Sequence, residues 1–253
     1  MPVFVPVLVF AVASFCLVAH IWTLNDWTDG RADGLDPNKT SRSFVGRGIA
    51  GSTFLCLSLL FLGIAFGLFV LLPLRTFVMA AAVALLGLCY SLPRFGLKQM
   101  PLAAGAIHLV GGGLHFLLGY SALAPLGPRA FMLAGFFGLV FAAGHSTQEV
   151  QDWSSDRHNG TRTAAVRLGP RTVFAAAAVI FVLAYLYLFF LGLSGWAPLR
   201  LAVLVVPLLP LQTLWFIRAW RSGLGFDQVS FLRERYRLLF GVIGLGIAST
   251  LFI

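Results

Sequence analysis

Charged side chains are scarce in this sequence of 253 residues, in which Asp, Glu, Lys and Arg together make up 11%. An average soluble domain carries about 25%. Hydrophobic residues make up 59%, and the mean hydropathy is +0.90. A soluble chain could not remove so much apolar surface from water, whereas a lipid bilayer solvates it. The composition therefore excludes an ordinary soluble domain and predicts an integral membrane protein built of helices.

Acids and cysteines are scarcer still. Nine acids stand against 18 Lys and Arg, which gives a net charge of +9. In a soluble protein this excess would favour nucleic acid, but beside a membrane it serves topology and anionic lipid, so we predict membrane lipid and no nucleic acid as partners. Cys16, Cys56 and Cys89 lie in apolar segments without CxxC or CxxH spacing. This excludes a disulfide framework or a zinc site of that kind and predicts small buried side chains.

Long apolar runs are what the sequence has in abundance. Runs of about 20 residues are long enough to cross a bilayer as helices. We predict an all-α, polytopic transmembrane helical bundle of about eight spans, forming a single domain over residues 1–253. The first run lacks a basic leader and a cleavage site, so we expect a retained span. The predicted spans are 2–24, 47–72, 75–92, 100–124, 129–150, 171–194, 197–219 and 236–253.

Basic residues are distributed unevenly over the predicted loops, of which the long ones are 25–46, 151–170 and 218–235. If the spans alternate in direction, only Arg75, Arg129 and Arg200 fall on the face opposite the long loops. The positive-inside rule then places the long loops, and all nine acids with them, in the cytoplasm. We therefore expect a multi-pass protein of a bacterial inner or plasma membrane.

Seven of the nine acids fall in two short stretches. In the first stretch, Asn25, Asp29 and Asp33 recur every four residues, and Asp26 precedes Asp29 by three. If the first helix continues through this stretch, these side chains lie along one helical face.

The second stretch has the same periodicity. Glu149, Asp152 and Asp156 share a helical face, and His145 stands one turn before Glu149 on that face. Stacked carboxylates repel one another, the more so near a low-dielectric bilayer. Mg²⁺ relieves that repulsion, because it takes one or two carboxylates together with substrate phosphate oxygens. Two such clusters at one end of a bundle predict a diphosphate held between metal ions.

Three motifs resemble those of the UbiA superfamily of intramembrane prenyltransferases. The family's N-D-x-x-D-x-x-x-D is matched by Asn25, Asp26, Asp29 and Asp33. Its E-x-x-D-x-x-x-D-R followed by G-x-x-T is matched by Glu149, Asp152, Asp156, Arg157, Gly160 and Thr163. Its Y-S-x-P-P-x-[KR]-x-K is matched at Tyr90, Ser91, Pro93 and Lys98, but departs at Arg94 and Gly96. Of the family's Asn-Arg-Pro after the first motif, only Arg42 carries over.

The resemblance implies roles for these residues. The implied metal residues, for Mg²⁺, are Asn25, Asp26, Asp29, Asp33, Glu149, Asp152 and Asp156. The implied diphosphate contacts are Asn25, Arg42, Lys98, Arg157 and Arg162, and the implied catalytic residues are Asp29, Asp152, Lys98 and Tyr90. The family commonly has nine spans with its first motif at the end of the second, so the chain is expected to lack the family's usual first helix.

The resemblance also implies an activity. An isoprenyl diphosphate would ionise with the help of Mg²⁺, and a lipophilic, aromatic acceptor within the membrane would capture the allylic cation. Three alternatives stay open: a terpene cyclase on the same scaffold, which needs no acceptor, an enzyme that uses a phosphoribosyl or other diphosphate donor, and an ion-coupled carrier. Carriers place such charges near the bilayer midplane, whereas these acids stand at span ends, which favours an enzyme.

The histidines of the predicted spans have two interpretations. His108 and His115 lie seven residues apart in one span and could line a central cavity, or could be neutral and bonded to neighbouring helices. His20 is expected to make an interhelical contact, and His145 could assist the second acidic motif. The glycines at 111–113 favour close helix packing over a phosphate-binding loop.

Overall fold

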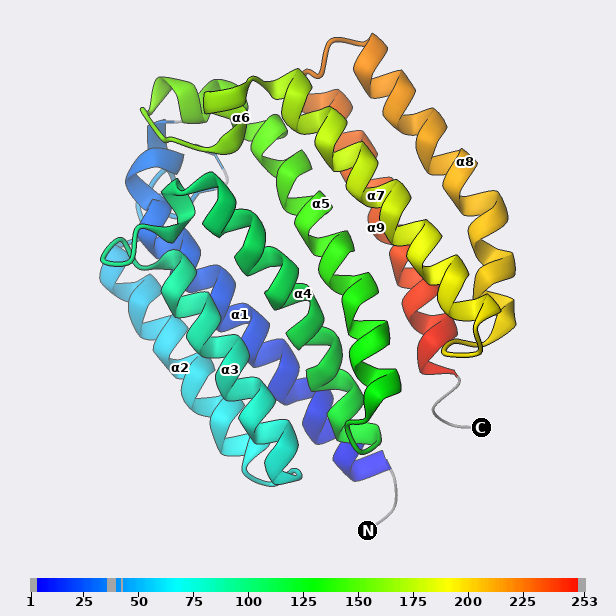
Figure 1. Cartoon of the computed structure of the whole chain (residues 1–253). Helices are drawn as coiled ribbons and strands as arrows, with labels where there is room; N and C mark the ends of the chain where they lie inside the picture. The colour runs from blue at the N-terminus through cyan, green and yellow to red at the C-terminus, as the bar shows by residue number, and fades with distance from the viewer. Residues whose placement is uncertain (1–3, 36–39, 42, 250–253) are drawn as a thin grey trace. The chain divides into compact units, whose positions relative to one another are not determined.

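The computed structural model describes residues 4–35, 40–41 and 43–249, and the regular elements of these residues are helices. The elements are α1 (Phe4–Leu35), α2 (Gly51–Phe69), α3 (Leu74–Ser91), a short 3₁₀ turn η1 (Leu97–Gln99), α4 (Pro101–Leu123), α5 (Pro128–His158), α6 (Ala164–Leu168), α7 (Pro170–Leu193), α8 (Leu199–Arg221) and α9 (Phe226–Ala248). Each of the eight predicted spans overlaps one long helix in the described residues (Figure 1). The predicted all-α architecture is confirmed.

Seven of the helices in the described residues are long and apolar enough to cross a membrane, namely α1 to α5, α7 and α8. These helices make the chain an integral membrane protein. The eighth long helix, α9, carries charged residues such as Asp227 and Glu234 in its first half. It begins at Phe226, inside the segment 218–235 that was predicted to be a loop. The prediction of a loop there is wrong because this segment is amphipathic, with Val229 and Leu232 fully buried.

Both acidic stretches are helical, as the periodicity predicted. Helix α1 continues past the predicted span to Leu35, and α5 continues to His158.

Several connections between helices contain proline or glycine at positions that suit these residues. Pro128 and Pro170 stand in the first turn of α5 and α7, where a missing N–H costs nothing. Gly169, between α6 and α7, has φ of +87°, a conformation that favours glycine.

The chain divides into two compact units, Met1–Lys98 and Gln99–Ile253. Whether they form one domain stays a prediction, and each is described by itself. In the first unit, α1 and α2 pack through buried small and aromatic residues such as Ala13, Ala65 and Phe69. His20 of α1 makes the expected interhelical contact, since its Nδ1 lies 2.9 Å from the Ser58 hydroxyl of α2.

The second unit has an aromatic core between α5, α7 and α9. Phe181 stacks on Phe240 at a centroid distance of 5.4 Å, and Tyr185 is fully buried beside them.

Helices α4 and α5 pack so closely that a glycine of each helix lies against the backbone of the other. A Cβ added to Gly112 would lie 2.5 Å from the Phe137 carbonyl oxygen, and one added to Gly138 would lie 2.6 Å from that of Leu109. Gly112 of α4 therefore serves close helix packing, as expected for the glycines at 111–113.

The cysteines are free in the described residues, but the prediction that all three are buried is wrong. Cys16 is buried, Cys89 is half-buried and Cys56 is exposed. The exposed faces of a membrane-spanning helix are apolar like its interior, so hydropathy does not distinguish a side chain facing lipid from one facing the core.

Candidate active site

The polar end of α1 carries the first acidic motif. Asn25 and Asp29 are one turn apart, and the Asn25 amide Nδ2 donates a hydrogen bond to Asp29 Oδ2 at 3.0 Å. Asn25 and Asp29 thus lie on one helical face, as expected, and the hydrogen bond directs one carboxylate oxygen of Asp29 toward the Asn25 amide.

Lys98 reaches this face from the turn η1. Its Nζ forms an ion pair with the Asp29 carboxylate and donates a hydrogen bond to Asn25 Oδ1 at 3.3 Å. The same ammonium lies 5.9 Å from the centre of the Tyr90 ring, within the range of a cation–π contact. The first unit therefore brings together four residues that the sequence singled out, from three separate segments. The Lys98 and Asp29 side chains are 30% and 24% exposed, so a ligand can reach both.

The two other aspartates of the first motif differ in exposure. Asp26 is exposed and Asp33 is half-buried, and both have further contacts in the structure. The predicted diphosphate residue Arg42 lies outside the described residues.

Gly30, inside the first motif, was missed as a site residue by sequence reasoning. A Cβ on Gly30 would lie 2.5 Å from the ring of Phe44, which stacks on Phe54 of α2 at 4.3 Å. The absence of a side chain at Gly30 lets the segment that carries Phe44 pack against α1. A glycine within an otherwise helical acidic motif was the available signal.

The second acidic motif occupies the end of α5 in the second unit. Asp152 and Asp156 are half-buried and both have contacts in the structure. Arg157 lies over the Trp153 ring, with its guanidinium carbon 5.6 Å from the ring centre. Arg162, in the connection to α6, is exposed.

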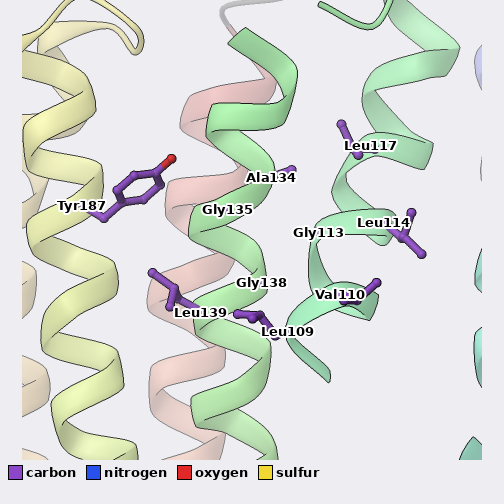
Figure 2. Close-up of a pocket in the computed structure, with 10 residues that line it drawn as sticks. All are labelled: Leu109, Val110, Gly113, Leu114, Leu117, Ala134, Gly135, Gly138, Leu139 and Tyr187. Carbon is purple, nitrogen blue, oxygen red and sulfur yellow. The ribbon is translucent and has the colours of Figure 1, made fainter. Parts of the chain in front are cut away.

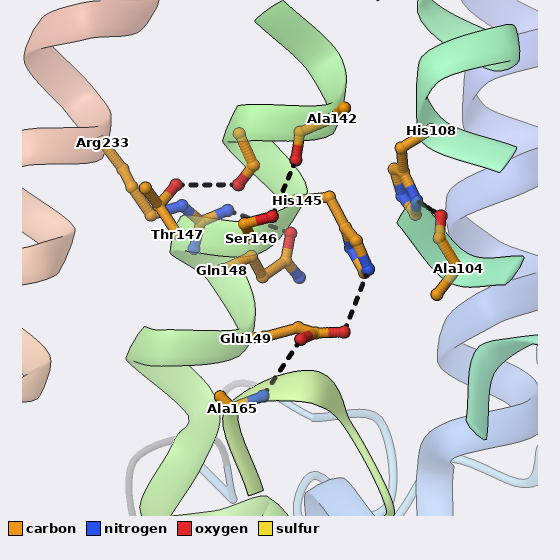
Figure 3. Close-up of polar contacts among 11 residues, drawn as sticks. Ala104, His108, Ala142, His145, Ser146, Thr147, Gln148, Glu149, Ala165 and Arg233 are labelled. Atoms are coloured by element: carbon orange, nitrogen blue, oxygen red, sulfur yellow. Dashed lines mark hydrogen bonds and ion pairs between the residues drawn. The ribbon is translucent and has the colours of Figure 1, made fainter. Parts of the chain in front are cut away.

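Glu149 has a different environment from these aspartates. It is only 5% exposed; its Oε1 lies 3.1 Å from His145 Nε2, and its Oε2 accepts a hydrogen bond from the Ala165 N–H at 3.3 Å (Figure 3). The His145 ring stacks on His108 of α4, with centroids 3.7 Å apart and an interplanar angle of 4°. His145 thus contacts the second motif, as the sequence left open.

The remaining histidines of α4 bond within their own helix. His108 Nδ1 lies 2.8 Å from the Ala104 carbonyl oxygen, and His115 Nδ1 lies 2.9 Å from that of Gly111. These two Nδ1 contacts lie within α4, and His108 also contacts the neighbouring helix α5 through its stack on His145.

Arg233 of α9 was also missed by the sequence. Its guanidinium donates to Gln148 Oε1 at 3.0 Å, where Figure 3 shows both residues. It also donates to Gln151 Oε1, and both glutamines lie on α5 beside the second motif. The signal was its spacing of three and four residues from Tyr236 and Val229, whose side chains are buried on the same face of α9.

The donor set fits Mg²⁺ bound in part through a phosphate. No three His, Cys, Asp or Glu side chains gather into a ready-made metal cage among the residues that the structure describes. Mg²⁺ does not need one, because it typically takes one or two carboxylates and completes its shell with water and substrate oxygens. Asp29 is partly exposed, and Asp152 and Asp156 stand one turn apart and half-buried, so each motif can offer oxygen ligands of this kind.

An apolar pocket of about 470 Å³ lies between α4, α5 and α7 in the second unit (Figure 2). Its only polar side-chain group is the Tyr187 hydroxyl, which donates to the Met132 carbonyl at 2.9 Å. Such a pocket suits hydrocarbon and offers nothing that binds phosphate. The lining residues are Leu109, Val110, Gly113, Leu114, Leu117, Ala134, Gly135, Gly138, Leu139 and Tyr187.

The sequence profile of the UbiA prenyltransferase family matches residues 1–232. The chain belongs to this family. Both acidic motifs and the Tyr90–Lys98 segment of this UbiA protein fall within the matched region.

Known proteins resemble the chain in sequence and in fold. The lycopene elongase/hydratase of Haloferax volcanii is 32% identical over 181 residues, which cover 71% of this chain and 58% of that protein. A UbiA homologue from Aeropyrum pernix K1 has a TM-score of 0.73 at 18% identity, over 96% of this chain and 90% of the homologue. One from Archaeoglobus fulgidus, bound to GPP and Mg²⁺, has a TM-score of 0.71 at 16% identity, over 96% and 88% of the two chains. At these identities the structural likeness establishes the fold alone.

Proposed function

We propose that this UbiA protein transfers an isoprenyl group from an isoprenyl diphosphate to a lipophilic acceptor within the membrane, with Mg²⁺ as cofactor. The observation that carries the proposal is the group formed by Lys98, Asp29, Asn25 and Tyr90. It combines a carboxylate for a metal, an ammonium for phosphate oxygens and an aromatic face, within reach of one ligand.

Lys98 is the residue that would move. Its ammonium pairs with Asp29, and an incoming diphosphate would offer it a stronger set of anionic oxygens. If Lys98 turned to the diphosphate, the Asp29 carboxylate would become available to hold a metal. Mg²⁺, when bound, neutralises the charge that develops on the leaving diphosphate. Lys98 adds a hydrogen-bonded positive charge at the same oxygens.

Tyr90 would stabilise the allylic cation. The Lys98 ammonium lies over the Tyr90 ring, 5.9 Å from its centre, so the face of the ring that is turned toward Lys98 can interact with a positive charge. The carbocation would form beside the leaving diphosphate, and the attraction of the ring would lower its energy without supplying a nucleophile.

The second motif would bind metal and phosphate in the second unit. We propose that Asp152 and Asp156 hold metal and that Arg157 and Arg162 contact phosphate. Their support is the shared helical face, the partial exposure of the aspartates and the exposed guanidinium of Arg162. The cytoplasmic position of the motif-bearing loops is also part of the proposal, and the distribution of basic residues supports it.

The acceptor is proposed to be a lipophilic molecule with π electrons. The mechanism requires a nucleophile that can attack a carbocation, and an aromatic ring or a polyene double bond meets that requirement. The curated relative is named for lycopene, an acyclic polyene. Because the match spans 58% of that relative, its acceptor enters as one arm of the test beside an aromatic acceptor.

The test uses the purified protein in nanodiscs with Mg²⁺ and geranyl, farnesyl or geranylgeranyl diphosphate. Each donor is supplied alone, with a lipophilic phenol or with an acyclic polyene, and both released pyrophosphate and lipid products are measured. We expect pyrophosphate and a prenylated product only when an acceptor is present, and neither after chelation of Mg²⁺. Release without acceptor, together with a cyclic hydrocarbon, would instead identify a terpene cyclase. Uptake into vesicles without any release would identify a carrier.

A further inference from the structure

Glu149 is the most deeply buried acid of the second motif, at 5% exposure, while Asp152 and Asp156 are half-buried. Both of its carboxylate oxygens are engaged within the second unit, one by the His145 imidazole at 3.1 Å and the other by the Ala165 N–H at 3.3 Å. A buried carboxylate is tolerated when protein groups of opposite polarity compensate it in this way. Each oxygen therefore already has a protein contact, and the burial of the carboxylate limits the approach of a metal ion.

The partners of Glu149 are themselves fixed. The His145 side chain is 9% exposed (Figure 3). The ring of His108 stacks on one face of the His145 ring, and the two ring centroids are 3.7 Å apart. Ala165 is fully buried in α6, the short helix that follows the exposed connection after α5. Glu149 thus joins three elements of the second unit: α4 through the histidine stack, α5 by its own backbone, and α6 by the backbone hydrogen bond.

We propose that Glu149 is not a metal ligand but a positioning residue, which fastens the 159–163 connection and α6 to α5 and thereby fixes Arg162 beside the second motif. The inference deepens the proposed function, because the importance of Arg162 rests on a diphosphate being bound there. The anchoring itself depends only on contacts within the second unit.

The chemistry of the anchor distinguishes two substitutions. Glu149→Gln keeps one oxygen that can accept from the Ala165 N–H and places an NH₂ group in the position of the other oxygen, so the connection stays fastened. Glu149→Ala removes the acceptor and leaves the buried Ala165 N–H unpaired, which raises the population of the detached connection. A metal ligand would respond differently, since Asn or Gln in place of a carboxylate removes the negative charge that Mg²⁺ requires.

The first measurement is limited trypsin digestion of the protein in detergent, without donor or metal. The cleavage sites around the anchor are Arg157, Arg162 and Arg167, and their products are identified by mass spectrometry. We expect Glu149→Ala to accelerate cleavage at Arg162 about tenfold, because proteolysis tracks the population of the open form. Glu149→Gln and the control Glu234→Gln, at an exposed glutamate of α9, stay within about twofold of the unmodified protein.

The second measurement is the Mg²⁺ concentration for half-maximal pyrophosphate release at saturating donor, compared with Asp152→Asn. We expect Glu149→Gln to leave this concentration within about twofold, while Asp152→Asn raises it about tenfold or more. A rise with Glu149→Gln as large as with Asp152→Asn, or unchanged trypsin cleavage in Glu149→Ala, overturns the proposal. If Asp152→Asn is the variant without effect, the proposed metal role of Asp152 fails, and the digestion result alone decides on the anchor.

Discussion

Lys98 forms an ion pair with Asp29, although 69 residues separate them along the chain. The lysine stands in the turn η1, after α3 has ended, and the aspartate in the last turns of α1. Because Lys98 also donates to Asn25, it links two residues of the first motif to the segment that carries Tyr90. This relationship supplies the positive charge that a stack of acids at a helix end needs.

Replacement of Lys98 tests its proposed role at the diphosphate. Lys98→Met removes the ammonium but keeps much of the apolar stem, and we expect kcat/KM for the donor to fall about 100-fold or more, because a positive charge at the leaving oxygens is lost. Lys98→Arg should retain a substantial part of the activity. The matched control is Arg94→Met, an exposed residue of the same segment, which should stay within about twofold. Equal activity of Lys98→Met and Arg94→Met would remove Lys98 from the site.

The metal assignment is tested by Asp29→Asn and Asp152→Asn, which preserve side-chain shape. Each should reduce Mg²⁺-dependent pyrophosphate release about 100-fold or more, because an amide is a poor ligand for a hard divalent cation. Thermal unfolding in detergent should remain close to that of the unmodified protein. Asp227→Asn, at an exposed acid of α9, serves as the control and should be fully active. Full activity in both site variants would contradict the metal assignment.

The close approach of α4 and α5 is tested by two alanine substitutions on α4. Gly112→Ala introduces a methyl 2.5 Å from the Phe137 carbonyl oxygen, so the helices must separate, and we expect a loss of stability of about 1–3 kcal/mol. Gly105→Ala introduces the same methyl where no atom lies within 4 Å, and should be neutral or slightly stabilising. The measurement is thermal unfolding in one detergent. Similar midpoints for the two variants would contradict the packing described here.

The buried hydrogen bond between Tyr185 and Gln212 joins α7 to α8, with the Tyr185 hydroxyl donating to Gln212 Oε1 at 2.8 Å. Tyr185→Phe leaves a buried amide oxygen without its donor and should cost about 1 kcal/mol. Gln212→Leu in the same background should recover part of that loss, because both polar partners are then gone. A double-mutant cycle from chemical or thermal unfolding gives the coupling energy. Additive effects would show that the contact contributes no coupling.

Local periodicity accounts for the part of the site that could be predicted from the sequence. Asn25 and Asp29 are one helical turn apart, and their hydrogen bond needs only the continuation of α1. The same holds for the shared face of Asp152 and Asp156 on α5. The apolar runs likewise predicted the spans, because bilayer thickness fixes the length of a crossing helix. The start of α9 was misjudged, since its first turns bury one face without being apolar overall.

Contacts between distant segments could not be predicted in this way. Glu149 and Asp152 belong to one motif and one helical face, yet Glu149 is buried against His145 and Ala165 while Asp152 is half-buried. Arg233 of α9 contacts Gln148 of α5, and although its spacing indicates the buried face of α9, that spacing does not identify the partner. Such differences depend on which neighbouring helix covers each turn, and helical periodicity carries no information on that.

The sequence by itself determined that this protein is a helical membrane protein, where its spans lie and which acids share a face, because bilayer thickness and the helical repeat act on neighbouring residues. Its motifs also indicated the UbiA family. Only the tertiary structure decided that Lys98 pairs with Asp29 beside Tyr90, and that Glu149 is enclosed by its own unit. Those arrangements arise from the packing of helices far apart in the chain, where the burial of each side chain is set by its neighbours in space.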